Sequence, residues 1–445
     1  MAMHGLTGGN ATSVDSEHHA GGKPGAQIPP WKRQPSTISG ESATLDLQRQ
    51  PRVLNMASSM EMSDLEPSTT PWRMTEAVLE TGSLVLAWND GHRSEFAVEW
   101  LRDNCACSAC RHPRAFERLY MFIDHPVPEI HSAVIGTDGS LQVEFADGEM
   151  RHSSRYSAGW LRRHGGAPDF LAEPFIQPRL WGADLNGHVR RFHHDAFMTS
   201  DEILQQWIDT LRTDGIALLH DTPCIPGQLL QVARRIGPVR GTNFGDHYDV
   251  VSMPNPNAVA YTPLGLELHT DLANWRLPPD FQLLACLKSS VSGGDSVFAD
   301  GFKVVEDLRR EQPAAFHLLT EQPVEFRFHD DSCDIRTAVA PITLNPDGTV
   351  RQIRFNNWLR AANPLPPARS RQLLSALGEW WRLLRLPANQ LHLRLEPGDL
   401  IVYHNHRVLH GRTPFDASTG ERHLQGCYVE LEDMQSTWRR LARSV

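Results

Sequence analysis

The chain has 445 residues, a formal net charge of −10, 40% hydrophobic residues and 22% charged residues. This is an ordinary globular composition, long enough for two domains with sizeable cores. The acidic balance argues against a nucleic-acid partner, because nucleic-acid-binding proteins normally present a basic surface. No apolar stretch is long enough to span a bilayer, so we expect no membrane partner. The first 30 residues contain no apolar secretory segment, and we expect a cytoplasmic location.

The N-terminal segment, residues 1–73, is rich in Ser, Pro, Gly and Thr and has little apolar periodicity. Such a segment cannot bury enough surface to offset the entropy lost on ordering. We therefore expect a disordered tail over residues 1–73. An overextended reading frame is the alternative, since several methionines between Met56 and Met74 could begin a shorter chain.

Two hairpin patterns follow, and they predict a small β-rich domain over residues 74–170. The segments 84–88 and 94–98 are predicted strands on either side of the turn Asn89-Asp90-Gly91, and Asp-Gly is a typical hairpin turn. The same pattern recurs from residue 141 to beyond residue 150. A Pro- and Gly-containing stretch near 165–178 is the expected linker.

The remaining residues, 180–445, predict a larger β domain with helical insertions. Apolar residues at helical spacing predict helices at 202–212 and 369–384. Short apolar runs predict strands at 215–219, 281–287, 324–328, 350–355, 400–404 and 424–431.

Three of the seven cysteines stand close together, as Cys105-x-Cys107-x-x-Cys110. An odd number of cysteines with one tight cluster indicates metal binding in a reducing compartment and not a disulfide framework. Three thiolates and one imidazole are a common structural zinc set. His152, at a predicted hairpin strand, is the expected fourth ligand, and His112 is its rival. The alternative is that the three thiols simply pack in a core.

A possible iron site begins with the tripeptide His269-x-Asp271. Residues i and i+2 of a strand face the same side, so the imidazole and the carboxylate would converge. With a distant histidine they would form a triad of two His and one carboxylate that leaves three positions open. His410 in the later His-Gly-Arg sequence is the expected third ligand. His404 and His406 are expected to be exposed or hydrogen-bonded instead.

Arg422 follows His410 by twelve residues, on or near the next predicted strand. A guanidinium binds a carboxylate through two parallel hydrogen bonds, which suits the distal end of a dicarboxylate co-substrate. Taken singly, an arginine at this position would more often form a surface ion pair.

In combination, these motifs resemble those of the gamma-butyrobetaine and trimethyllysine dioxygenases, within the wider taurine-dioxygenase-like superfamily. The resemblance covers residues 75–440. The motifs that carry it are Trp100-Leu101-Arg102-Asp103-Asn104-Cys105 with the cysteine cluster, Val259-Ala260-Tyr261 with His269-Thr270-Asp271, Gly293-Gly294-Asp295-Ser296, and Arg407-Val408-Leu409-His410-Gly411-Arg412 with Arg422.

The resemblance implies a double-stranded β-helix, or jelly roll, with helices packed outside it and a small zinc module before it. It implies Fe(II) on His269, Asp271 and His410, with the carboxylate of 2-oxoglutarate on Arg422. Structural Zn(II) would be held by Cys105, Cys107, Cys110 and His152. By analogy, we expect a homodimer, with ascorbate as reductant.

The implied reaction is hydroxylation of a small trimethylammonium acid with O2 and 2-oxoglutarate, foremost gamma-butyrobetaine to L-carnitine, with release of succinate and CO2. A quaternary ammonium cannot donate a hydrogen bond and is held by aromatic faces. The cage of the family falls here on Phe244, Tyr248, Tyr261 and Tyr428. Asn357, with its neighbour Asn356, is the candidate for the acid end of the substrate.

Three other functions remain open from the sequence. The first is a hydroxylase of another quaternary ammonium acid, such as trimethylammonio-ethylphosphonate or trimethyllysine. The second is a non-catalytic β-helix protein that binds a ligand, against which the complete triad argues, because a binding module needs no open iron positions. The third is a taurine-like sulfonate dioxygenase, which predicts neither an aromatic cage nor a cysteine module.

Overall fold

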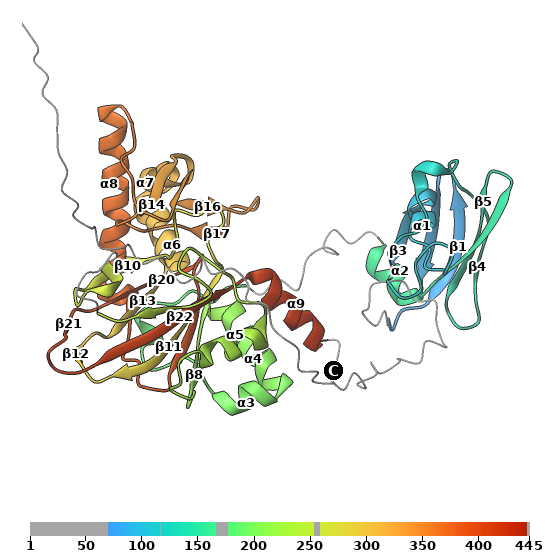
Figure 1. Ribbon diagram of the computed structural model, residues 1–445. Helices are drawn as coiled ribbons and strands as arrows, with labels where there is room; N and C mark the ends of the chain where they lie inside the picture. Colours follow the sequence, from blue (N-terminus) through green and yellow to red (C-terminus); the bar gives the residue numbers. More distant parts are fainter. Residues whose placement is uncertain (1–69, 116, 166–176, 253–258, 443–445) are drawn as a thin grey trace, which may run out of the picture. The chain divides into compact units, whose positions relative to one another are not determined.

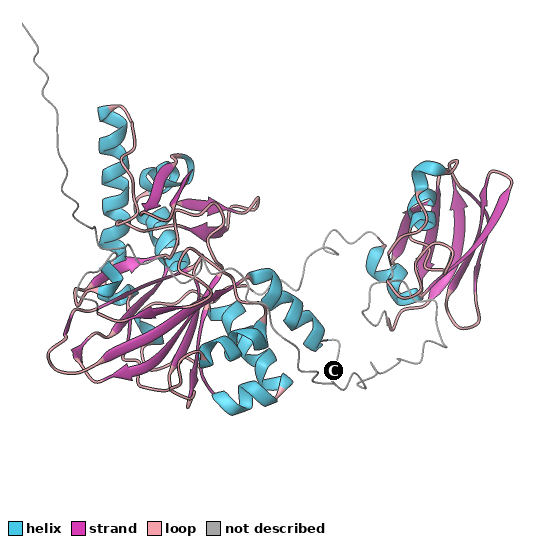
Figure 2. Cartoon of the chain, in the orientation of Figure 1, coloured by secondary structure: helices cyan, strands magenta, loops and turns pink. Residues whose placement is uncertain are grey.

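The computed structural model describes residues 70–115, 117–165, 177–252 and 259–442. These residues form mostly β-strands with helices beside them (Figures 1 and 2). The tail expected over residues 1–73 lies outside the described residues except for its last four, and so does most of the expected linker. No helix of the described residues is long and apolar enough to cross a membrane.

The first part, residues 70–165, contains two three-stranded antiparallel sheets around one core. Successive residues of a strand face opposite sides, so alternate side chains such as Leu84, Leu86, Leu141 and Val143 are buried together. The sheets consist of β1 (Met74–Glu80), β2 (Ser83–Trp88) and β3 (Arg93–Ala97), and of β4 (Glu129–Ile135), β5 (Leu141–Asp147) and β6 (Met150–Tyr156). Helices α1 (Val98–Asp103) and α2 (Ala158–His164) and the 3-10 turn Phe122–Asp124 complete this part.

The second part, residues 177–442, is built on a six-stranded and a four-stranded sheet. The larger sheet has the order β7 (Arg191–His193), β8 (Ile216–His220), β19 (Leu400–His404), β11 (Phe281–Ser289), β22 (Arg422–Val429) and β9 (Tyr248–Val250). The smaller sheet has the order β10 (Leu266–His269), β20 (Val408–Arg412), β13 (Ser296–Asp300) and β18 (Leu391–Leu393). Neighbours in both sheets are antiparallel except β7 and β8.

Because successive residues of a strand face opposite sides, the apolar residues of these sheets form one core between the sheets and one core outside each sheet. On β19, Ile401 and Tyr403 enter a core that also holds Phe298 of the smaller sheet, so this core lies between the sheets. The alternate residues Leu400 and Val402 enter a second core with the helices outside the larger sheet. Two sheets packed face to face with helices outside are the jelly roll that the sequence predicts, so the fold class is confirmed for the dioxygenase part.

Helices cover the outer face of each sheet. The core outside the larger sheet includes α3 (His194–Thr199), α4 (Asp201–Asp214), α5 (Gln228–Ile236) and α9 (Leu431–Ala442). The core outside the smaller sheet includes α6 (Gly301–Glu311), α7 (Pro313–Glu321), α8 (Pro367–Leu384) and the hairpins β14 (Val324–His329)–β15 (Asp334–Val339) and β16 (Ile342–Leu344)–β17 (Val350–Ile353). Short elements are β12 (Ser292–Gly293), β21 (Phe415–Asp416) and the 3-10 turns Ala183–Leu185, Val259–Tyr261 and Pro387–Asn389.

A buried ion pair joins the start of β20 to the end of β13. The guanidinium of Arg407 donates from Nε and Nη2 to the two carboxylate oxygens of Asp300 at 3.0 and 2.8 Å. The two side chains are only 2% and 0% exposed. Arg407 also donates to the backbone carbonyls of Thr213 and Arg179. Removing one charge would leave the other uncompensated in a low-dielectric interior, which is far more costly than losing an exposed pair.

We therefore predict that Arg407→Met lowers the free energy of unfolding by about 3–5 kcal/mol, because the Asp300 carboxylate stays buried without its partner. The matched control is Lys288→Met, which breaks the exposed pair with Glu421 and should cause no measurable change. Urea unfolding followed by circular dichroism measures both. Equal effects of the two substitutions would contradict the role assigned to the buried pair.

Candidate active site

The predicted metal ligands His269, Asp271 and His410 lie together in the described structure, with one ligand atom of each within 4.8 Å of the others. The Nε2 atoms of His269 and His410 lie 3.4 and 3.6 Å from the same carboxylate oxygen, Oδ1 of Asp271. His269 and His410 are directly opposite each other on β10 and β20. Their neighbours Leu268 and Leu409 point into the outer core, so both imidazoles point between the sheets.

The backbone at the tripeptide differs from the sequence-based interpretation. We expected His269 and Asp271 to share one face of a strand, but β10 ends at His269. Asp271 lies in the turn that follows, and the next residue, Leu272, has a φ of +52°. The carboxylate therefore reaches the imidazoles from a turn, and strand periodicity does not account for its position.

Residues from a distant segment hold this turn. The backbone N–H of Thr270 donates to the carbonyl of Phe355 at 2.8 Å, and the amide of Asn356 donates to the carbonyl of Thr270 at 3.2 Å. Arg354 donates to the carbonyls of Ala273, Trp275 and Arg276, which follow the turn. Burial lowers the pKa of Arg354 to about 10, so the guanidinium is still charged at neutral pH. The residues after β17 thus fix the backbone on both sides of Asp271.

The protonation states at the triad suit metal ligation. Burial, together with the nearby His269, lowers the pKa of His410 to about 3, so its imidazole is neutral at physiological pH. The Nδ1 of His269 lies 2.8 Å from the carbonyl of Glu267, which favours the tautomer with a proton on Nδ1. Its Nε2 lone pair then faces Asp271. Two imidazoles and one carboxylate that converge in this way fit the donor set of non-haem Fe(II).

The hydroxyl of Tyr428 touches the triad directly. It donates to Oδ2 of Asp271 at 2.8 Å, which leaves Oδ1 facing the two histidines. Tyr428 lies on β22, and its ring centroid is 5.5 Å from that of Tyr248 on β9. The hydroxyl of Tyr248 accepts a hydrogen bond from Nε2 of Gln282 at 2.7 Å. Gly426 leaves room for this arrangement, because a Cβ there would lie 2.4 Å from the Tyr248 ring.

A cavity of about 530 Å³ surrounds the triad and contains most of the predicted substrate residues. Phe244, Tyr248, Tyr261 and Tyr428 all line it, as does Arg422. The cavity also includes Gln282, Trp358 and Arg412, which the sequence did not single out as site residues. Arg412 stands within the His-Gly-Arg motif, so a signal was available. Gln282 and Trp358 had none that we could use.

The two arginines in this cavity differ in their hydrogen bonds. Arg412 donates to the backbone carbonyls of Ala260, Thr262 and Leu264, so it holds the chain that precedes β10. Arg422, at the start of β22, forms one hydrogen bond within the described part of the chain, from Nη2 to the carbonyl of Gly294 at 3.4 Å. Among the described residues no carboxylate is paired with it. Its remaining donors are available for a carboxylate ligand.

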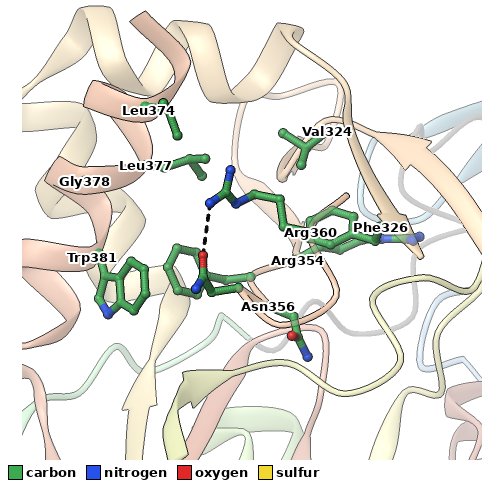
Figure 3. A pocket seen from close by; sticks show the side chains of 11 residues that line it. Val324, Phe326, Arg354, Asn356, Arg360, Leu374, Leu377, Gly378 and Trp381 are labelled. Carbon is green, nitrogen blue, oxygen red and sulfur yellow. Dashed lines mark hydrogen bonds between the residues drawn. The ribbon is translucent and has the colours of Figure 1, made fainter. Parts of the chain in front are cut away.

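Asn357, the residue predicted for the acid end of the substrate, lies apart from the other predicted substrate residues. Asn357 is exposed, and its side chain accepts a hydrogen bond from Arg360 at 3.2 Å. It lines a neighbouring, mostly apolar pocket beside α8, shown in Figure 3, and not the cavity around the triad. Asn356, its neighbour, lines both. Of the two asparagines that the sequence left open, Asn356 is the one placed near the triad.

The predicted zinc ligands converge in the first part of the chain. Nε2 of His152 lies 3.2, 3.7 and 3.6 Å from the Sγ atoms of Cys105, Cys107 and Cys110. The rival, His112, uses its Nδ1 to accept hydrogen bonds from the backbone of its own turn. Three thiols and one imidazole fit a closed tetrahedral zinc site, with no position left for a substrate.

His404 and His406 lie apart from the triad and near Asp280. Nδ1 of His406 is 3.0 Å from Oδ1 of Asp280, and its Nε2 is 3.1 Å from the carbonyl of Pro278. The ring of His404 stacks on Phe281 with centroids 4.8 Å apart. Neither histidine is therefore among the residues that meet at Asp271.

Comparison with known proteins assigns the chain to two related families. The family described as taurine catabolism dioxygenase TauD, TfdA family matches residues 176–428, and the gamma-butyrobetaine hydroxylase-like N-terminal family matches residues 77–162. This chain has a jelly roll with two histidines, one aspartate and an arginine in one cavity. It is therefore a non-haem iron dioxygenase that depends on Fe(II) and 2-oxoglutarate.

Three relatives are similar over most of their length. Gamma-butyrobetaine dioxygenase of Pseudomonas sp. (strain AK-1) is 39% identical, over 79% of this chain and 91% of the relative. The enzyme of the same name from Homo sapiens is 30% identical, over 81% and 94%. Mitochondrial trimethyllysine dioxygenase of Bos taurus is 29% identical, over 78% and 82%. The chain belongs to the gamma-butyrobetaine dioxygenase family within the TauD/TfdA dioxygenases.

The hydrogen bond from Tyr428 to Asp271 leads to a prediction about metal affinity. Tyr428→Phe removes this bond and keeps the ring, so Fe(II) affinity should fall by about tenfold, as for other groups that orient metal ligands. Tyr261→Phe is the control, since it removes a cavity hydroxyl that has no recorded bond to the triad. Anaerobic equilibrium dialysis with Fe(II) measures both. Unchanged affinity in Tyr428→Phe would contradict the prediction.

Proposed function

We propose that the protein hydroxylates gamma-butyrobetaine to L-carnitine, with 2-oxoglutarate and O2 as co-substrates and succinate and CO2 as co-products. The observation that carries this proposal is that four aromatic side chains line the same cavity as the triad and Arg422. The relatives named gamma-butyrobetaine dioxygenase support the choice of substrate.

In this proposal His269, Asp271 and His410 hold Fe(II), and Arg422 binds the distal carboxylate of 2-oxoglutarate. The metal, when bound, supplies oxidation of an unactivated C–H bond at the expense of 2-oxoglutarate and O2. The protein supplies placement: the imidazoles on β10 and β20 and the carboxylate from the turn at Asp271 would hold the ion. The cavity that these three side chains line would hold the co-substrate and the substrate close to it.

The trimethylammonium group would bind among Tyr248, Tyr261, Tyr428 and Phe244. A quaternary cation is attracted to the negative faces of aromatic rings, and the attraction is stronger where water is excluded. Arg422 and Tyr428 share one face of β22 and are six residues apart, which is about 20 Å along a strand. The co-substrate acid and the substrate cation are thereby recognised at opposite ends of one strand.

For the acid end of the substrate, Asn356 is our candidate in place of Asn357. It is 7% exposed, lines the cavity, and already donates to the carbonyl of Thr270. An amide recognises a carboxylate with less selectivity than a guanidinium does. The same cage would therefore admit other quaternary ammonium acids, and trimethylammonio-ethylphosphonate and trimethyllysine are the substrates to compare.

We further propose a structural Zn(II) on Cys105, Cys107, Cys110 and His152, in a small domain over residues 74–170 that precedes a dioxygenase domain over 180–445. The separate cores of the two parts and the two separate family matches support this division. The homodimer, the cytoplasmic location and the use of ascorbate stay predictions.

The main test is an assay of the purified full chain with Fe(II), ascorbate, 2-oxoglutarate and gamma-butyrobetaine, analysed by mass spectrometry. We expect L-carnitine and succinate in equal amounts. His410→Ala should abolish both, because it removes a metal ligand, while His392→Ala, at an exposed histidine, should retain activity.

Each other outcome of this assay has a definite meaning. Succinate without carnitine would reject gamma-butyrobetaine and keep the dioxygenase, and the other two betaines would then be tested as substrates. Neither product from protein with bound iron would contradict the catalytic proposal and favour a ligand-binding protein.

The zinc site gives a separate prediction. Elemental analysis of the purified chain should find one zinc ion per chain, retained in His112→Ala and lost in Cys107→Ser and His152→Ala, because only the latter two change the tetrahedral set. Iron binding should be unaffected in all of them if the chains fold. Full zinc content in His152→Ala would show that another group is the fourth ligand.

A further inference from the structure

We propose that Asn405 is a positioning residue for the metal site, because its side-chain amide fixes the backbone of Asp271. This inference rests on the proposed Fe(II) site. It concerns a residue outside the cavity, in the turn between β19 and β20, which does not touch the substrate or the metal.

The side chain of Asn405 pairs with both backbone groups of Asp271. Its Oδ1 accepts from the Asp271 N–H at 2.7 Å, and its Nδ2 donates to the Asp271 carbonyl at 3.1 Å. The same Nδ2 donates to the carbonyl of Pro279 at 2.9 Å. Asn405 is 1% exposed, and its own N–H donates to the carbonyl of Asp280 at 2.7 Å. Both N–H groups and the oxygen of the amide thus have partners, so the side chain has one defined orientation.

The two hydrogen bonds between Asn405 and Asp271 take the place of the backbone hydrogen bonds that a neighbouring strand would form. In a sheet, the N–H and C=O of one residue pair with a facing strand. The ladder between β10 and β20 stops at His269, so Asp271 has no such partner. The amide of Asn405 presents one N–H donor and its oxygen acceptor to Asp271, and it pairs with Asp271 as a strand residue would.

Each residue of the tripeptide is therefore held by a different segment. His269 is paired with His410 on β20, Thr270 with Phe355 after β17, and Asp271 with Asn405 in the β19–β20 turn. Asn405 precedes His410 by five residues, in the turn that leads from β19 of the larger sheet to β20 of the smaller sheet. The backbone of Asp271 is thereby tied to the same short segment that bears His410, which favours one separation of the carboxylate and the imidazole before a metal binds.

Asn405 could instead stabilise the fold without affecting the metal site. A second buried asparagine, Asn389, serves as a control that distinguishes these two roles. Asn389 is 2% exposed, accepts from Lys303 Nζ at 2.6 Å and donates to the carbonyl of Leu383 at 2.9 Å. Neither Lys303 nor Leu383 is near the tripeptide in sequence or lines its cavity. Asn389→Ala should therefore cost stability without altering the metal site.

The test is titration of the zinc-loaded, iron-free chain with Mn(II), followed by the electron paramagnetic resonance signal of the free ion. Mn(II) prefers nitrogen and oxygen ligands over thiolates, so it reports on the triad and not on the cysteines. We expect Asn405→Ala to weaken Mn(II) binding by about 10–100-fold, the effect typical of groups that orient metal ligands. Asn389→Ala should bind Mn(II) as the unaltered chain does, even if its melting temperature falls as much as that of Asn405→Ala.

If Asn405→Ala does not fold, Asn405→Gln provides the same test, since it keeps the amide and moves it by one methylene. It should also bind Mn(II) more weakly than the unaltered chain. Unaltered affinity in the Asn405 variants, or an equal loss in Asn389→Ala, would overturn the inference. Absence of Mn(II) binding to the unaltered chain would instead reject the metal site itself.

Discussion

The site depends on one register: His269 of β10 lies directly opposite His410 of β20 in an antiparallel pair. Opposed residues in such a pair have side chains only about 5 Å apart on the same face of the sheet. The two imidazole centroids are 4.2 Å apart as a result. A shift of either strand by one residue would turn its imidazole into the outer core and bring the neighbouring leucine, Leu268 or Leu409, to the inside. The large apolar cores on both faces of the smaller sheet therefore also fix the chemistry of the site.

Other contacts extend this constraint to the rest of the cavity. The buried pair between Arg407 and Asp300 anchors the start of β20, the strand that bears His410. The strand β22 of the facing sheet presents Arg422 and Tyr428 on the same inner side. Tyr428 then links the aromatic part of the cavity to the Asp271 carboxylate through its hydroxyl. The proposed substrate cage and the proposed metal site are thus joined by a hydrogen bond.

The sequence predicted those parts of the molecule that follow from local patterns. The strand at 400–404 has the predicted bounds, and the helix at 369–384 begins only two residues earlier than expected. The convergence of His152 with three cysteines also followed from spacing and hairpin geometry. The strand and the helix follow from apolar periodicity. The cluster follows from three cysteines that are close in sequence and have few histidines available as a fourth ligand.

The remaining details depend on contacts between segments that are distant in sequence. Strand periodicity predicted that His269 and Asp271 converge, as they do, but it gave the wrong backbone, because a turn held by Phe355 and Asn356 carries Asp271. The choice between Asn356 and Asn357 depends on which of two adjacent side chains faces the cavity. No local pattern distinguishes them, since the segment after β17 is irregular. Tyr428 was predicted as a cage residue, but its bond to Asp271 could not be read from the sequence.

The most direct test of the account is the dependence of turnover on the charge of the substrate. Gamma-butyrobetaine and 5,5-dimethylhexanoate have nearly the same shape, but only the first has a positive charge at its quaternary centre. Succinate release should be strongly stimulated by gamma-butyrobetaine and hardly by the neutral analogue, because only a cation is attracted to the aromatic faces. Equal stimulation by both compounds would contradict the account, since it would show that the cavity selects shape and not charge.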